Sequence, residues 1–165
     1  MPDIGPYQIK EEIHRGKLAA LFNAVDSRTG QEVAFKLLAA KSLNDPTIRA
    51  RYQREVQIIA SLNHPAIVPV LEYGEHENQP FVVMPWMMSG SLQQRLAEGP
   101  LSFDEACLII EQIASALDAV HELGILHGDI KPSNILFDVE GHPYLSDFGM
   151  IKLAEASLTP GSNAL

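Results

Sequence analysis

Cysteine, tryptophan and long apolar runs are scarce in this sequence of 165 residues. The single cysteine, Cys107, excludes a disulfide within the chain, which is typical of proteins in a reducing compartment. No apolar run reaches the roughly 18 residues that a membrane-spanning helix needs, and the N-terminus lacks the pattern of a secretory signal peptide. The sequence therefore predicts a cytoplasmic protein without a membrane segment.

Positive charge is also in short supply. The chain has 12 lysine and arginine residues against 21 aspartate and glutamate residues, which gives a formal net charge of -9. Nucleic acids and anionic membranes bind basic surfaces, so this charge argues against both as general partners. Any phosphate group must then be bound by a few placed cations and backbone amides. A zinc site is not expected, because the spacing of four histidines is not that of zinc ligands: His14, His76, His121 and His142.

What the sequence does have is a hydrophobic content of 46%, enough for a packed core. Its first half has the pattern of strands around one helix. Asp45 and Pro46 are typical of the cap and the first position of that helix, and its apolar stripe ends before Pro65. Runs rich in β-branched and aromatic residues predict five strands, at residues 7–14, 18–25, 32–38, 67–73 and 80–84.

The second half is helical as far as a polar loop. Ser91 and Ser102 each precede a glutamine or glutamate at the spacing of a capping box, which marks a helix start. They predict a short helix that ends near Gly99 and a long one that ends at Gly124. After the loop, the residues at 135–137 and 143–146 predict a small hairpin.

The long helix has apolar side chains at helical spacing, so we expect them on one buried face. Cys107 lies within this pattern and is expected to be a buried, structural thiol. The apolar residues are Ala106, Ile109, Ile110, Ile113, Leu117 and Val120.

The polar loop is the most informative stretch of the chain. It reads His-Gly-Asp-Ile-Lys-Pro-Ser-Asn from His127 to Asn134, and Asp147-Phe148-Gly149 follows it. One acid can orient a hydroxyl nucleophile, a lysine can offset phosphate charge, and an amide and a second acid can hold magnesium. Two linked motifs at this spacing rarely arise by chance. The pattern indicates a phosphoryl-transfer site.

With these motifs, the chain from about Tyr7 onward resembles the eukaryotic-type protein kinases, in the serine/threonine branch found in bacteria. Val33-Ala34-Phe35-Lys36 is similar to the third-strand lysine motif of that family. The resemblance implies an α+β, protein-kinase-like two-lobe fold. We expect a five-stranded antiparallel small lobe with one helix at 1–84, a hinge at 85–90, and a partial, mainly helical large lobe at 91–165.

The resemblance also implies the chemistry of the loop. Asp129 would orient the substrate hydroxyl, and Lys131 would steady the transferring γ-phosphoryl group. Asn134 and Asp147 would be magnesium ligands, since they offer the hard oxygen donors that this ion prefers. The cofactors would be ATP and Mg²⁺. The substrate would be a protein with serine or threonine hydroxyls, which the Lys131-Pro132 pair favours within the family.

Further residues would bind the nucleotide. Lys36 would contact its α- and β-phosphates while an ion pair with Glu55 holds the lysine extended. Taken alone, Glu55 can also pair with Arg51 or Arg54 on the same helix. The resemblance places Gly16, Leu21, Ala34, Met84, Pro85, Met87 and Leu136 around the nucleotide. It also implies an apolar column between the lobes, made of Ile59, Val70, His127 and Phe148.

Some features depart from the family pattern. The phosphate-covering loop of the family normally carries three glycines, but residues 14–19 contain only Gly16. Gly128 replaces the arginine that usually precedes the catalytic aspartate. These departures leave open a nucleotide-binding pseudokinase or interaction module. An inactive truncated fragment is a further alternative, because the resemblance implies more large-lobe helices after Leu165. The substrate protein, the regulatory signal and the oligomeric state do not follow from the sequence.

Overall fold

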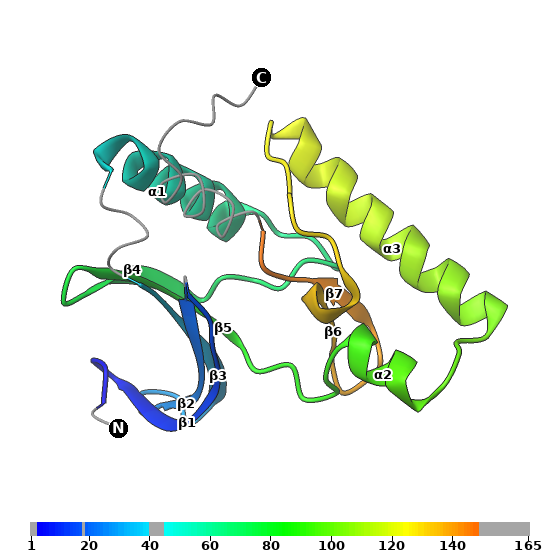
Figure 1. Ribbon diagram of the computed structural model, residues 1–165, viewed down its shortest axis with the longest axis horizontal. Coiled ribbons are helices and arrows are strands. Elements are labelled where there is room, and N and C mark those ends of the chain that lie inside the picture. Colours follow the sequence, from blue (N-terminus) through cyan, green and yellow to red (C-terminus); the bar gives the residue numbers. More distant parts are fainter. Residues whose placement is uncertain (1–2, 18, 40–44, 149–165) are drawn as a thin grey trace.

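The computed structural model describes residues 3–17, 19–39 and 45–148, which form two regions side by side. Figure 1 shows a β-sheet and α1 on one side and α2, α3 and a small hairpin on the other. The five-stranded sheet has the order β1-β2-β3-β5-β4, and each pair of neighbours is antiparallel. Its strands are β1 (Tyr7–Arg15), β2 (Ala19–Asp26), β3 (Glu32–Leu38), β4 (Glu72–His76) and β5 (Gln79–Pro85). The predicted five-stranded antiparallel lobe is confirmed.

One face of the sheet is filled by aromatic and aliphatic side chains. Alternation along β2 buries Ala20, Phe22 and Ala24 on this face, as the two-residue period of a strand requires. The Phe35 ring stacks on Phe81 at 5.0 Å between centroids and lies 5.4 Å from the ring of Tyr7. This packing fixes the register of β3, which carries Lys36 next to Phe35.

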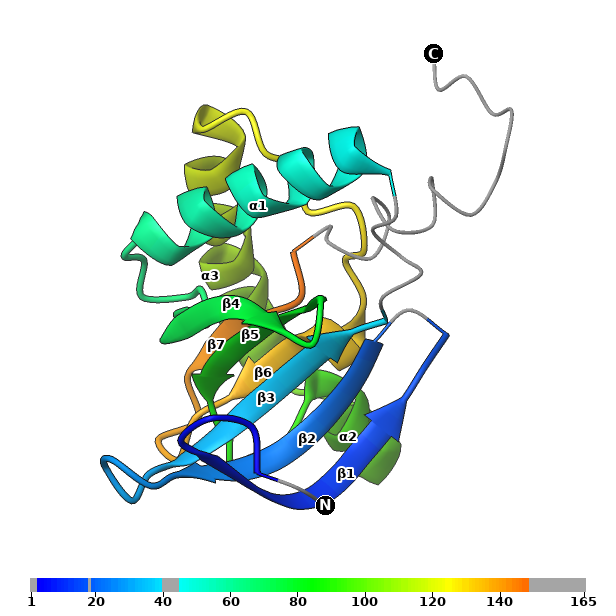
Figure 2. The same ribbon diagram turned by 90° about the vertical axis from the view of Figure 1, so that its left-hand side faces the viewer.

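Helix α1 (Pro46–Ser61) begins where the sequence predicts and lies beside β4 (Figure 2). The Asp45 carboxylate accepts hydrogen bonds from the backbone N–H groups of Thr47 and Ile48, so it caps the helix. Tyr52 and Val56 of α1 pack with Val82 and Met84 of β5 in one buried cluster. The helix is thereby held against the strand that leads out of the sheet.

The second region consists of α2 (Leu92–Glu98), α3 (Phe103–Glu122), the 3-10 turn η2 (Pro132–Asn134) and an antiparallel hairpin of β6 (Ile135–Phe137) and β7 (Pro143–Leu145). Ser91 forms the predicted reciprocal capping box, and the Ser102 hydroxyl accepts from the backbone of Glu105. Among the described residues, no helix has the length and hydropathy that crossing a membrane requires.

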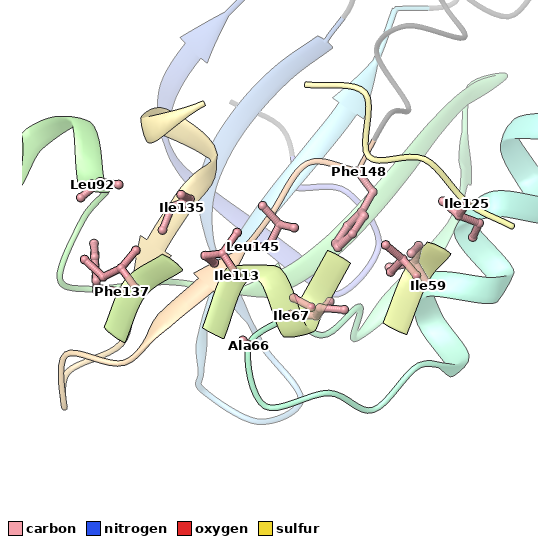
Figure 3. Packing of buried hydrophobic residues seen from close by; sticks show 13 residues of the cluster. Ile59, Ala66, Ile67, Leu92, Ile113, Ile125, Ile135, Phe137, Leu145 and Phe148 are labelled. Atoms are coloured by element: carbon pink, nitrogen blue, oxygen red, sulfur yellow. The ribbon is translucent and has the colours of Figure 1, made fainter. Parts of the chain in front are cut away.

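A shared core joins the two regions. Ile113 of α3 packs with Leu145 of β7, and Phe148 lies in the same cluster as Ile59 of α1 (Figure 3). The cluster includes Ile67, which forms an isolated parallel bridge with Leu145. The residues that could carry the chemistry therefore lie around one continuous core.

The predicted strand at 67–73 is wrong in its bounds. The start of this run is bound to β7 instead of the sheet, since the Val68 N–H donates to the Leu145 carbonyl at 3.0 Å, whereas the Leu71 N–H already donates to the Val83 carbonyl of β5 at 2.8 Å. Strand β4 begins at Glu72 and continues to His76. Glu77 and Asn78 then form the turn, and both have positive φ angles of 50° and 63°, the combination that tight hairpins favour.

The predicted buried face of α3 is also wrong in part. Ile109, Ile113, Ala116 and Val120 are buried, whereas Ile110 is 67% exposed and Cys107 is exposed. The hairpin covers one side of the helix, and the described residues leave the other side open. Cys107 is therefore not a buried thiol in this structure.

A polar network closes the sheet at its two outer strands. The Tyr7 hydroxyl of β1 donates to the Glu72 carboxylate of β4 at 2.6 Å, and Arg28 donates to Tyr7, Glu72 and Asp26. Burial and the Glu72 hydrogen bond raise the pKa of Tyr7 to about 12. Because β1 and β4 are the ends of the strand order, the sheet must curl for these groups to meet.

Candidate active site

The loop between α3 and β6 is organised by a buried histidine. His127 is only 1% exposed, and its Nε2 donates to the Ser146 carbonyl at 2.8 Å. Its Nδ1 accepts from the backbone N–H of Asp129 at 3.2 Å, which fits a single neutral tautomer. Burial lowers the pKa of His127. The neutral imidazole therefore fixes the backbone just before Asp129 through its two hydrogen bonds.

The predicted acid, lysine and amide of the loop lie together. The Asp129 carboxylate accepts from Lys131 Nζ at 2.6 Å and from Asn134 Nδ2 at 3.1 Å. Asn134 Nδ2 also donates to the Asp129 carbonyl at 2.8 Å, because η2 turns the chain back over the loop. The hydrogen bond from Lys131 is the main reason why the pKa of Asp129 lies below its usual value. Asp129 is thus an ionised and positioned carboxylate.

The backbone conformation explains a glycine at position 128, where the family usually has arginine. Its φ is 77°, in the left-handed region that side chains other than glycine rarely adopt. A glycine therefore allows the turn between His127 and Asp129 without backbone strain. The departure from the family pattern is compatible with the observed position of Asp129.

Lys36 and Asp147 form an ion pair between the two regions. The Nζ–Oδ1 distance is 2.5 Å, and Lys36 is only 5% exposed although it carries a charge. Asp147 has a φ of 59°, an uncommon conformation for a residue with a side chain. Lys36 comes from β3 and Asp147 from the segment after β7, so the fold brings together two residues that the sequence analysis assigned to one site.

The expected ion pair between Lys36 and Glu55 is not formed among the described residues. Glu55 instead pairs with Arg51, one helical turn earlier, at 3.0 Å. Lys36 already has a carboxylate partner in Asp147, and Arg51 is within local reach of Glu55 at the i,i+4 spacing. The local alternative for Glu55 is therefore the one that this structure adopts.

Most of the residues expected around adenine also converge. Met84 is buried, and Ala34, Met87 and Leu136 pack against the same cluster. The backbones of Ala34 and Met84 are register partners in the sheet, as are Val33 and Pro85. These contacts form an apolar wall between the end of β5 and β6.

Two further residues expected around the nucleotide lie at the start of the sheet. Leu21, expected against the adenine ring, is the register partner of Lys36. Gly16, expected over the phosphates, donates its N–H to the Ala19 carbonyl at 2.9 Å in the turn between β1 and β2. Gly16 has no positive φ, so it is not needed here for an unusual backbone angle. Its role would be to let the backbone come close to the phosphates. Gly149 and the chain from there to Leu165 lie outside the described residues.

The predicted apolar column is brought together. Ile59 and Phe148 are buried in one cluster and Val70 packs against it. The rings of His127 and Phe148 are 4.8 Å apart between centroids. Figure 3 shows Phe148 and Ile59 within this core, and Phe148 directly follows Asp147 in the chain.

Sequence reasoning missed Ser146 and a carboxylate–histidine cluster. Ser146 is 4% exposed and hydrogen-bonded to both His127 and Asn134, but a lone serine at a strand end carries no sequence signal. Asp138, Glu140 and His142 have potential metal-ligand atoms within 4.8 Å of one another. They line a cavity of about 520 Å³, and the Asp138 carboxylate accepts the backbone N–H groups of both other residues, as turn formation requires.

The fold is that of a protein kinase domain. Residues 7–163 match the protein kinase domain family, and the chain belongs to that family. Serine/threonine-protein kinase PknD of Mycobacterium tuberculosis is 40% identical over 158 residues, which cover 95% of this chain and 23% of PknD. The probable serine/threonine-protein kinase PknB of Lactococcus lactis is 41% identical over 156 residues, covering 93% of this chain and 25% of PknB.

Solved structures give the same result. The crystal structure of the Mycobacterium tuberculosis PknI kinase domain has a TM-score of 0.78 and 26% identity, and covers 90% of this chain and 62% of that chain. A crystal structure of Rad53 in complex with AMP-PNP has a TM-score of 0.78 and 29% identity, with coverage of 88% and 38%. The chain spans about a quarter of the length of the curated relatives named above.

We expect the His127 imidazole to be mostly neutral at pH 6.5, the ordinary midpoint of histidine, because burial lowers its pKa. A histidine whose pKa is lower in the folded state than in the unfolded state contributes stability at pH values above its unfolded-state pKa. This contribution is lost as the pH falls through the folded-state pKa. Imidazole nitrogen NMR spectra recorded between about pH 7.5 and 5 measure the protonation directly. Half-protonation of His127 at pH 6.5 or above would contradict this assignment.

We expect Asp147→Asn to lower the free energy of unfolding by about 3 kcal/mol, because it leaves the buried Lys36 charge without a partner. Asparagine tolerates the left-handed backbone at this position, so the change isolates the charge. The double variant Lys36→Met with Asp147→Asn removes both charges and should be more stable than Asp147→Asn alone. Urea unfolding measures both values. A double variant that is at least as unstable as Asp147→Asn would show that the pair does not hold the site together.

Proposed function

We propose that this chain carries the catalytic centre of an ATP- and magnesium-dependent protein kinase that transfers the γ-phosphate to serine or threonine hydroxyls. The observation that carries the proposal is a pair of linked contacts: Lys36 is ion-paired with Asp147, and Asp129 is hydrogen-bonded to Lys131 and Asn134. Ser146, which precedes Asp147, joins the two because it donates to the Asn134 carbonyl. A fold without this chemistry gains little from a buried lysine, because removing a charge from water is costly. The five side chains are those that phosphoryl transfer uses.

The donor set fits magnesium. Asn134 uses its Nδ2 on Asp129, which leaves its Oδ1 as the free donor atom of the amide. Asp147 supplies a carboxylate that is 29% exposed, so a hydrated ion can reach it. Hard oxygen ligands with room for water suit magnesium. Asn134 and Asp147 would hold the ion, which when bound neutralises charge on the phosphates.

Asp129 would orient the substrate hydroxyl and accept its proton. The low pKa keeps this carboxylate ionised, and its hydrogen bonds to Lys131 and Asn134 fix its direction. Lys131 is a cation in contact with Asp129, and 48% of its side chain is exposed. It would turn from Asp129 to the transferring phosphoryl group and offset its negative charge.

Lys36 would bind the α- and β-phosphates. An ammonium group has three donors, so Lys36 can keep one hydrogen bond to Asp147 and offer the others to phosphate. Glu55 would join Lys36 after releasing Arg51. An exposed pair at i,i+4 is worth only about 0.3–0.5 kcal/mol, and the Arg51 side chain is 68% exposed. The exchange of Arg51 for Lys36 as the partner of Glu55 therefore has a small free-energy cost.

The relatives support the substrate classes. PknD and PknB are named serine/threonine-protein kinases, which supports serine or threonine as the acceptor. Rad53, similar in structure to this chain, was crystallised with AMP-PNP, which supports an adenine nucleotide as the donor. We also propose residues 85–90 as the hinge between the lobes, supported by the hydrogen bond from the Trp86 N–H to the Glu32 carbonyl at 3.4 Å. A cytoplasmic site of action would follow from the use of ATP.

A nucleotide-binding pseudokinase is the second candidate. The observations in its favour are the single glycine of the loop at 14–19 and the pairing of Glu55 with Arg51 in place of Lys36. Thermal stabilisation by AMP-PNP and magnesium without phosphotransfer to any peptide would support it. The inactive-fragment alternative is favoured by the exposed side of α3, where Phe103 is 82% and Ile110 is 67% exposed.

We expect Asp129→Asn to lower the rate of γ-phosphate transfer to a serine- or threonine-containing protein by about 100-fold or more, the size of a general-base contribution. Nucleotide binding should stay within about twofold of wild type, because Asp129 faces the acceptor and not the nucleotide. Radiolabelled transfer and AMP-PNP titration measure the two effects. The matched control is Asp118→Asn, an exposed aspartate of α3. Undiminished transfer by Asp129→Asn would defeat the assignment.

A further inference from the structure

Ser146 lies at the junction of the catalytic loop and the segment that carries Asp147. It is 4% exposed. Its carbonyl accepts from His127 Nε2 at 2.8 Å, and its N–H and Oγ both donate to the Asn134 carbonyl, at 2.9 and 3.0 Å. One buried residue thus contacts both ends of the loop at 127–134.

The two bonds to the Asn134 carbonyl fix the backbone of a proposed magnesium ligand. A carbonyl oxygen has two lone pairs, and Ser146 occupies it with two donors. The side-chain amide of Asn134 is held by Asp129 from the other side. Backbone and side chain are therefore both constrained, and the direction of Oδ1 is set by these contacts.

The second proposed ligand directly follows Ser146. Asp147 has a φ of 59°, a conformation that a residue with a side chain keeps only when its surroundings impose it. Its neighbour Ser146 is the closest fixed point, because three hydrogen bonds anchor that residue. The position of the Asp147 carboxylate relative to Asn134 thus depends on Ser146.

We propose that the Ser146 hydroxyl is a positioning group. It sets the geometry between Asn134 and Asp147, the proposed magnesium ligands, without touching the ion or the nucleotide. This inference rests on the proposed function of the site. The hydroxyl would determine how much magnesium the nucleotide complex requires, and leave the affinity for metal-free nucleotide unchanged.

Ser146→Ala separates this role from folding. The variant keeps the backbone N–H that donates to the Asn134 carbonyl, so no buried acceptor is left without a partner. It removes only the Oγ bond. Ser146→Thr retains a hydroxyl and is the conservative rescue variant. Ser115→Ala is the matched control, since it removes a hydroxyl of α3 whose partner is His64.

AMP-PNP binding to the 165-residue chain is measured by titration at increasing magnesium concentration and in EDTA. We expect Ser146→Ala to need about fivefold more magnesium for half-maximal binding, the factor that corresponds to one net hydrogen bond. Its dissociation constant in EDTA should stay within about twofold of wild type. Ser146→Thr and Ser115→Ala should both behave as wild type in magnesium.

Two results of this titration overturn the proposal. The first is a wild-type magnesium requirement in Ser146→Ala. The second is an equal loss of affinity with and without magnesium, which indicates a merely structural hydroxyl.

Failure of the proposed function has a different signature, which is a wild-type chain that binds no nucleotide in either condition. Amide hydrogen exchange of the metal-free protein then decides the positioning claim. Faster exchange at Asp129 and Asn134 in Ser146→Ala, with Phe35 and Val82 unchanged, supports it. Unchanged exchange at Asp129 and Asn134 overturns it.

Discussion

The ion pair between Lys36 and Asp147 is the contact on which the arrangement of the site depends. Lys36 is almost fully buried at the centre of the sheet, and a buried ammonium group needs a partner because losing its hydration is costly. Its partner belongs to the other region of the chain. In this structure the buried charge of the sheet is therefore paired by the segment after β7, which brings Asp147 to β3.

The apolar core beneath this pair makes the contact specific. Phe148 follows Asp147 and packs in one cluster with Ile59 of α1, while its ring lies against His127. A shift of Asp147 would therefore disturb α1 and the loop together. This coupling links the position of Glu55 on α1 to the state of the site, although Glu55 itself is paired with Arg51 in this structure.

Local sequence rules predicted much of this fold and site. Caps at Asp45, Ser91 and Ser102 marked helix starts that the structure confirms, because a cap is a contact within a few residues. The loop motif also brought Asp129, Lys131 and Asn134 together as expected. Here too the contacts are short in sequence, so residue spacing carries the information.

Contacts between distant segments limited the prediction. Ile67 and Val68 have the pattern of a strand start, but they pair with Leu145 of β7 and not with the sheet. The exposure of Cys107 depends on which side of α3 the hairpin covers. Likewise, Ser146 has a role only because His127 and Asn134 reach it through space. None of these partners is visible in the local pattern.

Among the residues that the structure describes, two groups of side chains could bind a divalent ion. One is the pair Asn134 and Asp147, and the other is the cluster of Asp138, Glu140 and His142. Manganese substitutes for magnesium at oxygen sites, and its unpaired electrons broaden nearby NMR signals. In the presence of AMP-PNP, our account predicts that the first signals lost on adding manganese are those of Asn134 and Asp147. Loss confined to Asp138, Glu140 and His142 would contradict it.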